Sequence, residues 1–151
     1  MMFAMSPLHL QAGDNTGAMH QFRRARLRAW MNQQWARLLG RSRALVELST
    51  IMRETCVSQR HHAGIQAVPI DQICGTEGRS DDFDRDFNPL NDRARERWTA
   101  VFNLWQRGLA SPPVDLIRVD EVYFVRDGHH RVSVARTLGQ KYIEAVVTEW
   151  K

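Results

Sequence analysis

The sequence predicts an α+β (α/β) domain over residues 65–151, a small mixed sheet with packed helices, preceded by an N-terminal helical segment. The aromatic and β-branched run Val122–Val125, the turn pair Asp127-Gly128 and a helical pattern that stops at Gly139 indicate strand, turn and helix. Residues 142–149 alternate apolar and polar side chains, as a half-buried strand does. Aromatic residues recur at helical spacing between residues 94 and 105.

The composition fits one globular domain with an appendage. The 151 residues, 43% of them hydrophobic and 25% charged, suffice for a core. Cys56 and Cys74 are too few and too far apart for a zinc knuckle or a secreted disulfide scaffold, so a cytoplasmic location is expected. No apolar run approaches about 18–20 residues, so no transmembrane segment is expected. The net charge of +4 favours anionic partners, but nearly all the basic residues are arginine, a bias that genomic base composition can produce.

The N-terminal part should consist of a leader and a basic amphipathic helical segment. Residues 1–17 contain proline and glycines and no sustained period, which predicts a disordered leader. Within residues 18–60, a helix should run from Ala18 to Leu39 and end at Gly40. Its tryptophans should be buried against the domain or against a second copy, which would give a homodimer through the N-terminal helices. The predicted apolar stripe is Met19, Phe22, Leu27, Trp30, Met31, Gln34, Trp35 and Leu38.

Arginines occupy the other face of this helix, and no acid occurs from residue 21 to residue 45. Such a face can bind nucleic acid through its phosphates, without sequence specificity. It can also be the solvated face of an amphipathic helix, or lie on an anionic membrane. We favour the solvated face on sequence alone. The candidate nucleic-acid-binding residues are Arg23, Arg24, Arg26 and Arg28.

The stretch between this helix and the domain shows weaker patterns. Residues 41–56 repeat apolar side chains and predict a second helix, hence a helical hairpin. The polar run 58–64 reads as a linker, and residues 66–70 as the first strand of the domain. A short helical turn over 71–74 should lead into the loop 75–80, whose glycines make it adaptable.

Two more elements should complete the core. A helix capped by Asn88 or Asn91 should end at Gly108, with its aromatic residues buried. Residues 114–119 should form a hairpin with the strand at 122–125.

The turn at Asp127-Gly128 is the predicted functional site. As the N-cap, Asp127 would accept the backbone N–H of His129 or His130. Arg131 should begin the buried stripe of the helix, with its guanidinium free to reach along the strand ends. Cations at this end of a helix lose about 0.3–1 kcal/mol each, which a bound anion would reverse. The pattern therefore predicts a phosphate or carboxylate site, and the alternative is a capped turn with solvated side chains.

Asp-Gly-His-His-Arg at 127–131, with Ala135 four residues after the arginine, resembles the phosphate-binding motif of the ParB/sulfiredoxin superfamily. The order of elements around the motif fits as well, and the resemblance covers roughly residues 65 to 150. It implies an α/β nucleotide-binding domain in which Asp127, Gly128, His129, His130 and Arg131 contact phosphate.

The same resemblance gives roles to the loop after the first strand. That loop would fold over the nucleotide, with Arg79 on phosphate and Glu77 as catalytic base or metal ligand. The alternative is an ion pair within the loop. His129 stands where sulfiredoxins carry their catalytic cysteine, so sulfinic-acid repair is not expected. No room is expected after Lys151 for the DNA-reading domain of full partition proteins.

Three kinds of function remain open at this point. The first is a ParB-like protein that binds nucleotide or phosphate, as a nucleotide hydrolase or a DNA-associated partition-like module. The second is a small-molecule phosphotransferase that uses a nucleoside triphosphate with magnesium, with Glu77 as general base. The third is a non-catalytic interaction domain. No metal site of the protein's own is expected, because the run Asp82-x-Asp84-x-Asp86 lacks the glycine and glutamate of a calcium loop.

Overall fold

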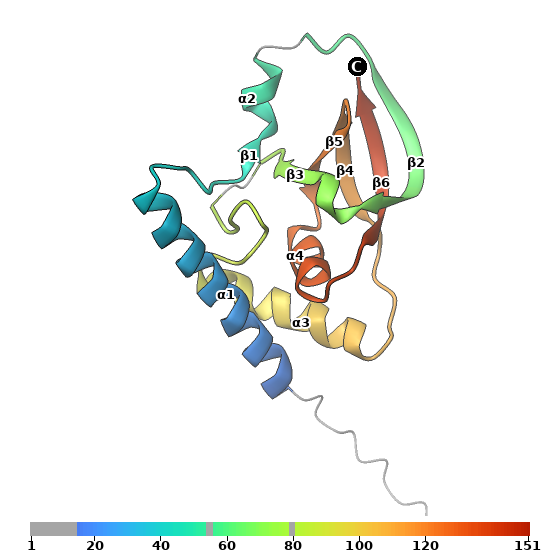
Figure 1. Cartoon of the computed structure of the whole chain (residues 1–151). Helices are drawn as coiled ribbons and strands as arrows, with labels where there is room; N and C mark the ends of the chain where they lie inside the picture. The colour runs from blue at the N-terminus through green and yellow to red at the C-terminus, as the bar shows by residue number, and fades with distance from the viewer. Residues whose placement is uncertain (1–14, 54–55, 79–80) are drawn as a thin grey trace, which may run out of the picture.

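In the described part of the chain six strands form one mixed sheet, with helices in layers on one face and a short helix on the other, so the predicted α+β class is confirmed (Figure 1). The computed structural model describes residues 15–53, 56–78 and 81–151. Within this part no helix has the length and hydropathy needed to cross a bilayer. The elements are α1 (Asn15–Leu38), β1 (Val46–Glu47), α2 (Leu48–Met52), β2 (Arg60–Pro69), the 3₁₀ helix η1 (Ile70–Gln72), β3 (Ile73–Thr76), the 3₁₀ helix η2 (Asp92–Ala94), α3 (Arg95–Gln106), β4 (Val114–Val119), β5 (Val122–Asp127), α4 (His129–Thr137) and β6 (Tyr142–Trp150).

The strand order is β1-β3-β5-β4-β6-β2, with the predicted β4–β5 hairpin at the centre. Strand β3 runs parallel to β5, and Thr76 pairs with Val125. Because parallel strands end at the same edge of a sheet, the segment after β3 and the start of α4 meet there. This pairing brings Glu77 beside the predicted turn, since the Glu77 N–H also bonds to the Val125 carbonyl at 3.0 Å.

The two faces of the sheet bury different elements, because side chains alternate along each strand. Leu116 and Val125 face the main core, in which α4 packs on the sheet, α3 on α4 and α1 on α3. Ile117 and Phe124 face the other side, where α2 covers them through Leu48. The start of α4 therefore lies at a sheet edge with a helical layer beside it.

Helix α1 packs through small residues, and its tryptophans are exposed, contrary to the sequence expectation. The buried face carries Phe22 and a row of alanines, and Phe22 meets Trp98 of α3 edge to face at 5.6 Å. Trp30 and Trp35 are 58% and 63% exposed. The step of five residues from Phe22 to Leu27 turns the helix by about 140°, so the stripe drawn from the sequence joined two different faces. The buried alanines are Ala18, Ala25, Ala29 and Ala36.

Several expectations for residues 15–76 are also wrong. Residues 15–17 begin α1, while the rest of the expected leader, residues 1–14, lies outside the described residues. Residues 41–53 form the short strand β1 and the five-residue α2, so the helical hairpin does not form. The expected linker instead enters the sheet, because β2 begins at Arg60 and pairs with β6. The helical turn expected over 71–74 is present as the 3₁₀ helix η1, but it ends at Gln72, and Ile73 and Cys74 already belong to strand β3.

The later elements match their sequence signals. The Asn91 side chain caps η2 by accepting the Arg93 N–H at 3.1 Å, and α3 ends before Gly108, whose φ is +69°. Helix α4 begins directly after Gly128, and Val134 and Ala135 are fully buried, as predicted. Trp98 of α3 is also fully buried and donates from its indole N–H to the Ser133 hydroxyl at 2.9 Å. This bond joins α3 to the helix that carries the predicted site.

Candidate functional site

Glycine, not aspartate, stands at the N-cap of α4. Gly128 has φ +106° and ψ +22°, and as a glycine it supplies no side-chain cap to the helix. A Cβ on Gly128 would come within 2.6 Å of Val114 Cγ1, so both the backbone angle and the space require glycine. The first N–H groups of a helix have no intrahelical partner, so the start of α4 presents donors and the positive end of the helix dipole. The expectation that Asp127 is the N-cap is wrong, because Asp127 is the last residue of β5.

His129 is held against the end of β3. Its Nε2 lies 2.7 Å from the Thr76 hydroxyl, and Thr76 is fully buried. The imidazole also stacks on Phe83, with ring centroids 6.3 Å apart. These contacts fix the imidazole ring between Thr76 and Phe83, which precede His129 by 53 and 46 residues in the sequence.

His130 is half-buried and lies near Arg97 of α3. Burial, and then the positive charge of Arg97, lower the pKa of His130 from its ordinary value of 6.5, while Asp82 and Asp127 act in the opposite direction. The Phe83 ring meets His130 edge to face at 5.3 Å. His130 is therefore kept largely neutral near pH 7 beside an arginine and a helix N-terminus.

Arg131 is occupied by its own chain, contrary to the expectation of a free guanidinium. Its Nη1 donates to the Pro112 carbonyl and, at 2.9 Å, to the Pro113 carbonyl. Its Nη2 donates to the Asp127 carboxylate at 2.8 Å, and the Arg131 side chain is only 15% exposed. Asp127 and Arg131 thus connect the turn to the loop before β4. The resemblance to a phosphate-binding motif gave no indication of these hydrogen bonds.

Glu77 reaches the site as half of an ion pair. Its Oε2 accepts from Arg126 Nε at 2.9 Å, and Arg126 Nη1 lies 3.8 Å from Asp115 Oδ2. The alternative expectation for Glu77, an ion pair within the loop, is therefore correct in kind. The partner, Arg126, lies on β5 and not in the loop. Arg79, the other residue predicted in this loop, lies outside the described residues.

A cavity of about 890 Å³ joins these residues. Its wall combines the turn before α4, the segment after β3 and the exposed side of α3. Arg97 takes part in none of the ion pairs found in the described part of the chain. The lining residues are Glu77, Gly78, Asp82, Phe83, Arg97, Ala100, Val101, Arg126, Asp127, Gly128, His129, His130 and Arg131.

A buried aspartate organises the loop that carries Phe83. Asp84 is fully buried and accepts the backbone N–H groups of Asp86 and Asn88 at 2.9 and 2.8 Å. Burial raises the pKa of Asp84, and these hydrogen bonds act against that rise. The loop is therefore built around one carboxylate, which places Phe83 against both histidines.

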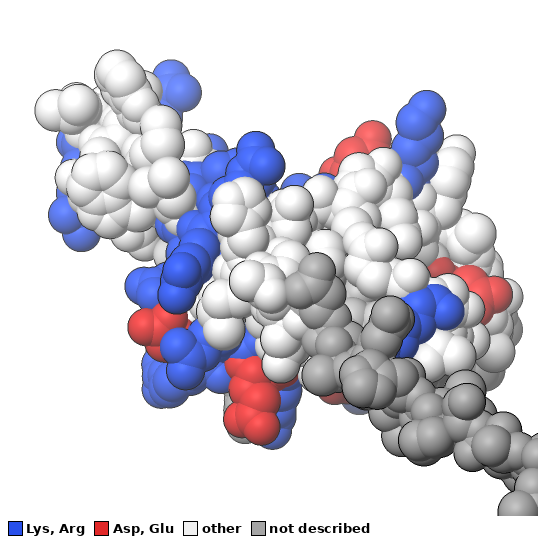
Figure 2. All heavy atoms as spheres, turned by 90° about the horizontal axis from the view of Figure 1, so that it is seen from below, with Lys and Arg blue, Asp and Glu red and all other residues white. Residues whose placement is uncertain are grey.

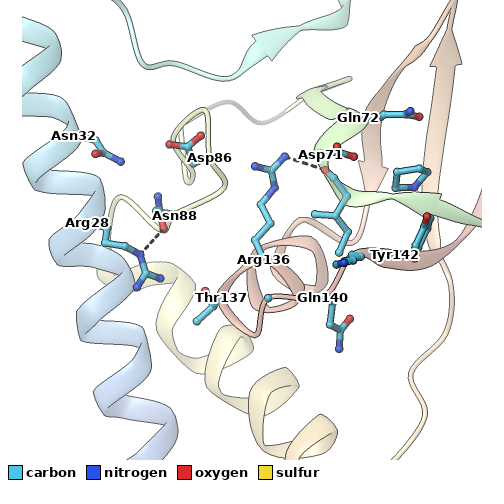
Figure 3. A pocket seen from close by; sticks show the side chains of 14 residues that line it. Arg28, Asn32, Asp71, Gln72, Asp86, Asn88, Arg136, Thr137, Gln140 and Tyr142 are labelled. Carbon is cyan, nitrogen blue, oxygen red and sulfur yellow. Dashed lines mark hydrogen bonds between the residues drawn. The ribbon is translucent and has the colours of Figure 1, made fainter.

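A second and slightly larger cavity, of about 960 Å³, lies at the other end of α4 (Figure 3). Arg28 and Arg136 reach toward it, but Arg136 Nη2 donates to the carbonyls of Ile70 and Ile73 at 3.1 and 2.7 Å. Arg28 Nε lies 3.5 Å from the Asn88 side-chain oxygen. These contacts give Arg136 a structural role, and we place the candidate site at the smaller cavity because the start of α4 opens there.

The four arginines proposed for nucleic acid are not equivalent. Arg26 pairs with Asp92 at 2.6 Å, and Arg28 contacts Asn88. Arg23 and Arg24 are exposed and form no ion pair with any described residue.

Sequence reasoning missed two groups of site residues. Arg97 follows the helical pattern of α3 as an exposed position, and only the packing of α3 on α4 brings it to the turn. Thr76 and Phe83 sit in a short strand and a loop without a regular period. Arg126 directly precedes the predicted turn in the sequence, but its pairing with Glu77 depends on the parallel β3–β5 register. None of these contacts has a signal in local sequence.

Comparisons with known proteins add a similarity of fold. No protein family model matches the chain, and no curated protein matches it. Among solved structures, the chain is similar to the crystal structure of sulfiredoxin from Arabidopsis thaliana, with 23% sequence identity and a TM-score of 0.37. The match covers 55% of this chain and 82% of that chain. The similarity concerns the arrangement of the chain alone, and at this TM-score no activity, ligand or site residue follows from it.

Proposed function

We propose that this protein binds a phosphate-bearing ligand, in the first instance a nucleotide, at the start of α4. One observation carries the proposal: Arg97 lies beside the half-buried His130 at the N-terminus of α4, with no ion-pair partner among the described residues. The positive charge of Arg97 at the positive end of a helix is unfavourable unless an anion is bound there. The cavity of about 890 Å³ lies within the range typical of small-molecule and cofactor sites.

The donors available to such a ligand differ from those that the motif suggests. The described hydrogen bonds of Arg131 already use both Nη1 protons and one Nη2 proton. Arg126 is neutralised by Glu77. Arg97 and His130, at the positive end of the α4 dipole, therefore provide the main anion contacts of the proposal.

Magnesium would enter this site with the phosphates of the ligand. Within the described residues, no group of three or more His, Cys, Asp and Glu side chains could hold a metal ion. Magnesium in nucleotide sites is commonly held by substrate phosphates with one or two carboxylates and waters. Asp82 and Glu77, which line the cavity, are the carboxylates that fit that role.

The binding step is tested by isothermal titration calorimetry with nucleoside di- and triphosphates and inorganic phosphate, with and without magnesium. Arg97→Gln should weaken binding about tenfold to a hundredfold, the loss of one charge-assisted hydrogen bond. Arg107→Gln makes the same charge change at the far end of α3 and should leave the affinity unchanged. No binding by the unaltered protein, or equal affinity of the two variants, would overturn the proposal.

A chemical step is a separate question, and the position of Glu77 makes it worth testing. Its carboxylate lines the same cavity, where a base for hydrolysis of a nucleotide, or for transfer of phosphate to a small hydroxyl compound, would stand. Glu77→Gln should then abolish product formation but keep ligand binding. Release of inorganic phosphate identifies a hydrolase, and a phosphorylated acceptor identifies a transferase. Binding without either product leaves a nucleotide-binding interaction domain.

A further inference from the structure

Helix α1 has an apolar face that the rest of the described chain does not cover. This face is centred opposite the alanine face that packs on α3, since Leu27, Met31 and Leu38 follow the helical period, with the polar Gln34 among them. Leu39, just after the helix, extends it and is 64% exposed. Isolated exposed apolar residues are ordinary, but a contiguous patch of them marks an interaction surface. The exposed fractions are 56% for Leu27, 58% for Trp30, 47% for Met31, 63% for Trp35 and 78% for Leu38.

The charges that α1 itself carries all have one sign, and the acid nearest the patch is Asp92 of η2, beside Leu27 and Trp30. Helix α1 contains five arginines and no acidic residue. Arg23 and Arg24 lie on the same side as the patch, one turn before Leu27, and Arg28 lies at its margin, as the helical period requires. Figure 2 shows Lys and Arg side chains next to uncharged surface on the side of the molecule where α1 lies in Figure 1. Only Arg26 of the five is neutralised by a described acid, Asp92.

We infer that this face of α1 binds the surface of an anionic lipid bilayer. A helix with leucines and tryptophans on one face and arginines along it lies in the interface plane, with its apolar side chains among the acyl chains. Tryptophan is enriched at membrane–water interfaces, and arginines near the surface attract anionic headgroups. Helix α1 is the outermost helix of the layer (Figure 1), and the patch lies on the side of α1 that is turned away from α3.

Charge and side-chain type favour the bilayer over two other occupants. A second copy of α1 would offer arginines to arginines and no acid to pair with them. Single-stranded nucleic acid would satisfy the arginines and could stack on Trp30 and Trp35. It would leave the aliphatic side chains of Leu27, Met31 and Leu38 in water, because these cannot stack on bases. At a bilayer interface the arginines can contact anionic headgroups while the leucines, methionine and tryptophans enter the acyl-chain region.

The test is co-sedimentation of the full-length protein with vesicles of phosphatidylcholine alone and of phosphatidylcholine mixed with phosphatidylglycerol. The protein should bind the anionic vesicles, weakly or not at all the neutral ones, and less as salt is added. Replacing Arg23 and Arg24 by Gln should lower the affinity by about fivefold for each arginine. Trp30→Ala with Trp35→Ala should lower it at least as much and remove the blue shift of tryptophan emission that the vesicles cause. Ile65→Ala with Leu109→Ala removes two exposed apolar residues elsewhere and should change neither readout.

Three results would overturn the inference. One is the absence of binding to anionic vesicles at low salt by a folded protein, as judged by circular dichroism. The second is a dimer in light scattering that the Trp30 and Trp35 substitutions dissociate, which would assign the face to a second copy. The third is binding of single-stranded DNA that is tighter than vesicle binding and lost in the same variants, which would assign the face to nucleic acid.

Discussion

Alanine substitutions at Phe22 and Trp30 should have very different effects on stability, because Phe22 is buried against α3 while Trp30, about 80° further around α1, is exposed. Phe22 is 1% exposed and packs against Trp98, so Phe22→Ala removes a buried ring and leaves a cavity between α1 and α3. The expected loss is about 3–5 kcal/mol in the free energy of unfolding. At about 2–4 °C per kcal/mol for a domain of this size, the melting temperature should fall by about 6–20 °C. Trp30 is 58% exposed, so Trp30→Ala should change the free energy of unfolding by no more than about 0.5 kcal/mol.

The assay is urea unfolding followed by far-ultraviolet circular dichroism, which does not depend on tryptophan emission. If the free energy of unfolding falls with urea concentration at the same slope in both variants, the variants unfold from comparable native states. The reasoning is refuted if Trp30→Ala costs as much as Phe22→Ala, because α1 would then be rotated so that the sequence stripe faces the core. A small cost for both variants would show that α1 contributes little to the folded domain.

Three further outcomes concern the turn before α4. Gly128→Ala should cost about 1–3 kcal/mol, because φ is +106° there and the new Cβ would crowd Val114; urea midpoints measure it. In an NMR titration the pKa of His130 should lie below 6.5, so the unfolded chain binds its proton more readily and this residue's contribution to stability is lost as the pH falls below 6.5. A midpoint at or above 6.5 in the ligand-free protein would contradict the burial of that ring. Arg131→Ala should lower stability by about 1–3 kcal/mol even without ligand, since the carbonyl of Pro113 loses its donor; an unchanged midpoint would show that the tie is not needed.

The central part of the fold could be predicted because each of its signals is local. The run Val122–Val125, the glycine at 128 and the period of Val134 and Ala135 each act within a few residues, and the structure has strand, turn and helix there. Strand β3 was missed for the opposite reason. It has only four residues, and one of them is Gly75. Any other residue at position 75 would place its Cβ 2.2 Å from the Val46 carbonyl oxygen. Glycine at that position serves a long-range contact, so locally it resembles a loop signal.

The candidate site shows the same division between local and long-range information. The sequence placed Asp127, Gly128 and the two histidines at a helix start, and they lie there. It could not show which cations are already paired, because the Pro112 and Pro113 carbonyls, Glu77 and Asp115 come from other segments. The direction of a side chain follows from the helical period, whereas its partner depends on the packing of the whole domain.

The pairing of these cations determines how a ligand would have to bind. An anion that contacted Arg126 or Arg131 would compete with Glu77 or Asp127, and part of its binding energy would be lost in breaking those pairs. An anion beside Arg97 and His130 displaces no described ion pair. Burial, and then the positive charge of Arg97, lower the pKa of His130, and a bound anion opposes both because it favours the charged imidazolium. Ligand binding and protonation of His130 should therefore favour each other, and phosphate affinity should rise as the pH falls toward the pKa of that histidine.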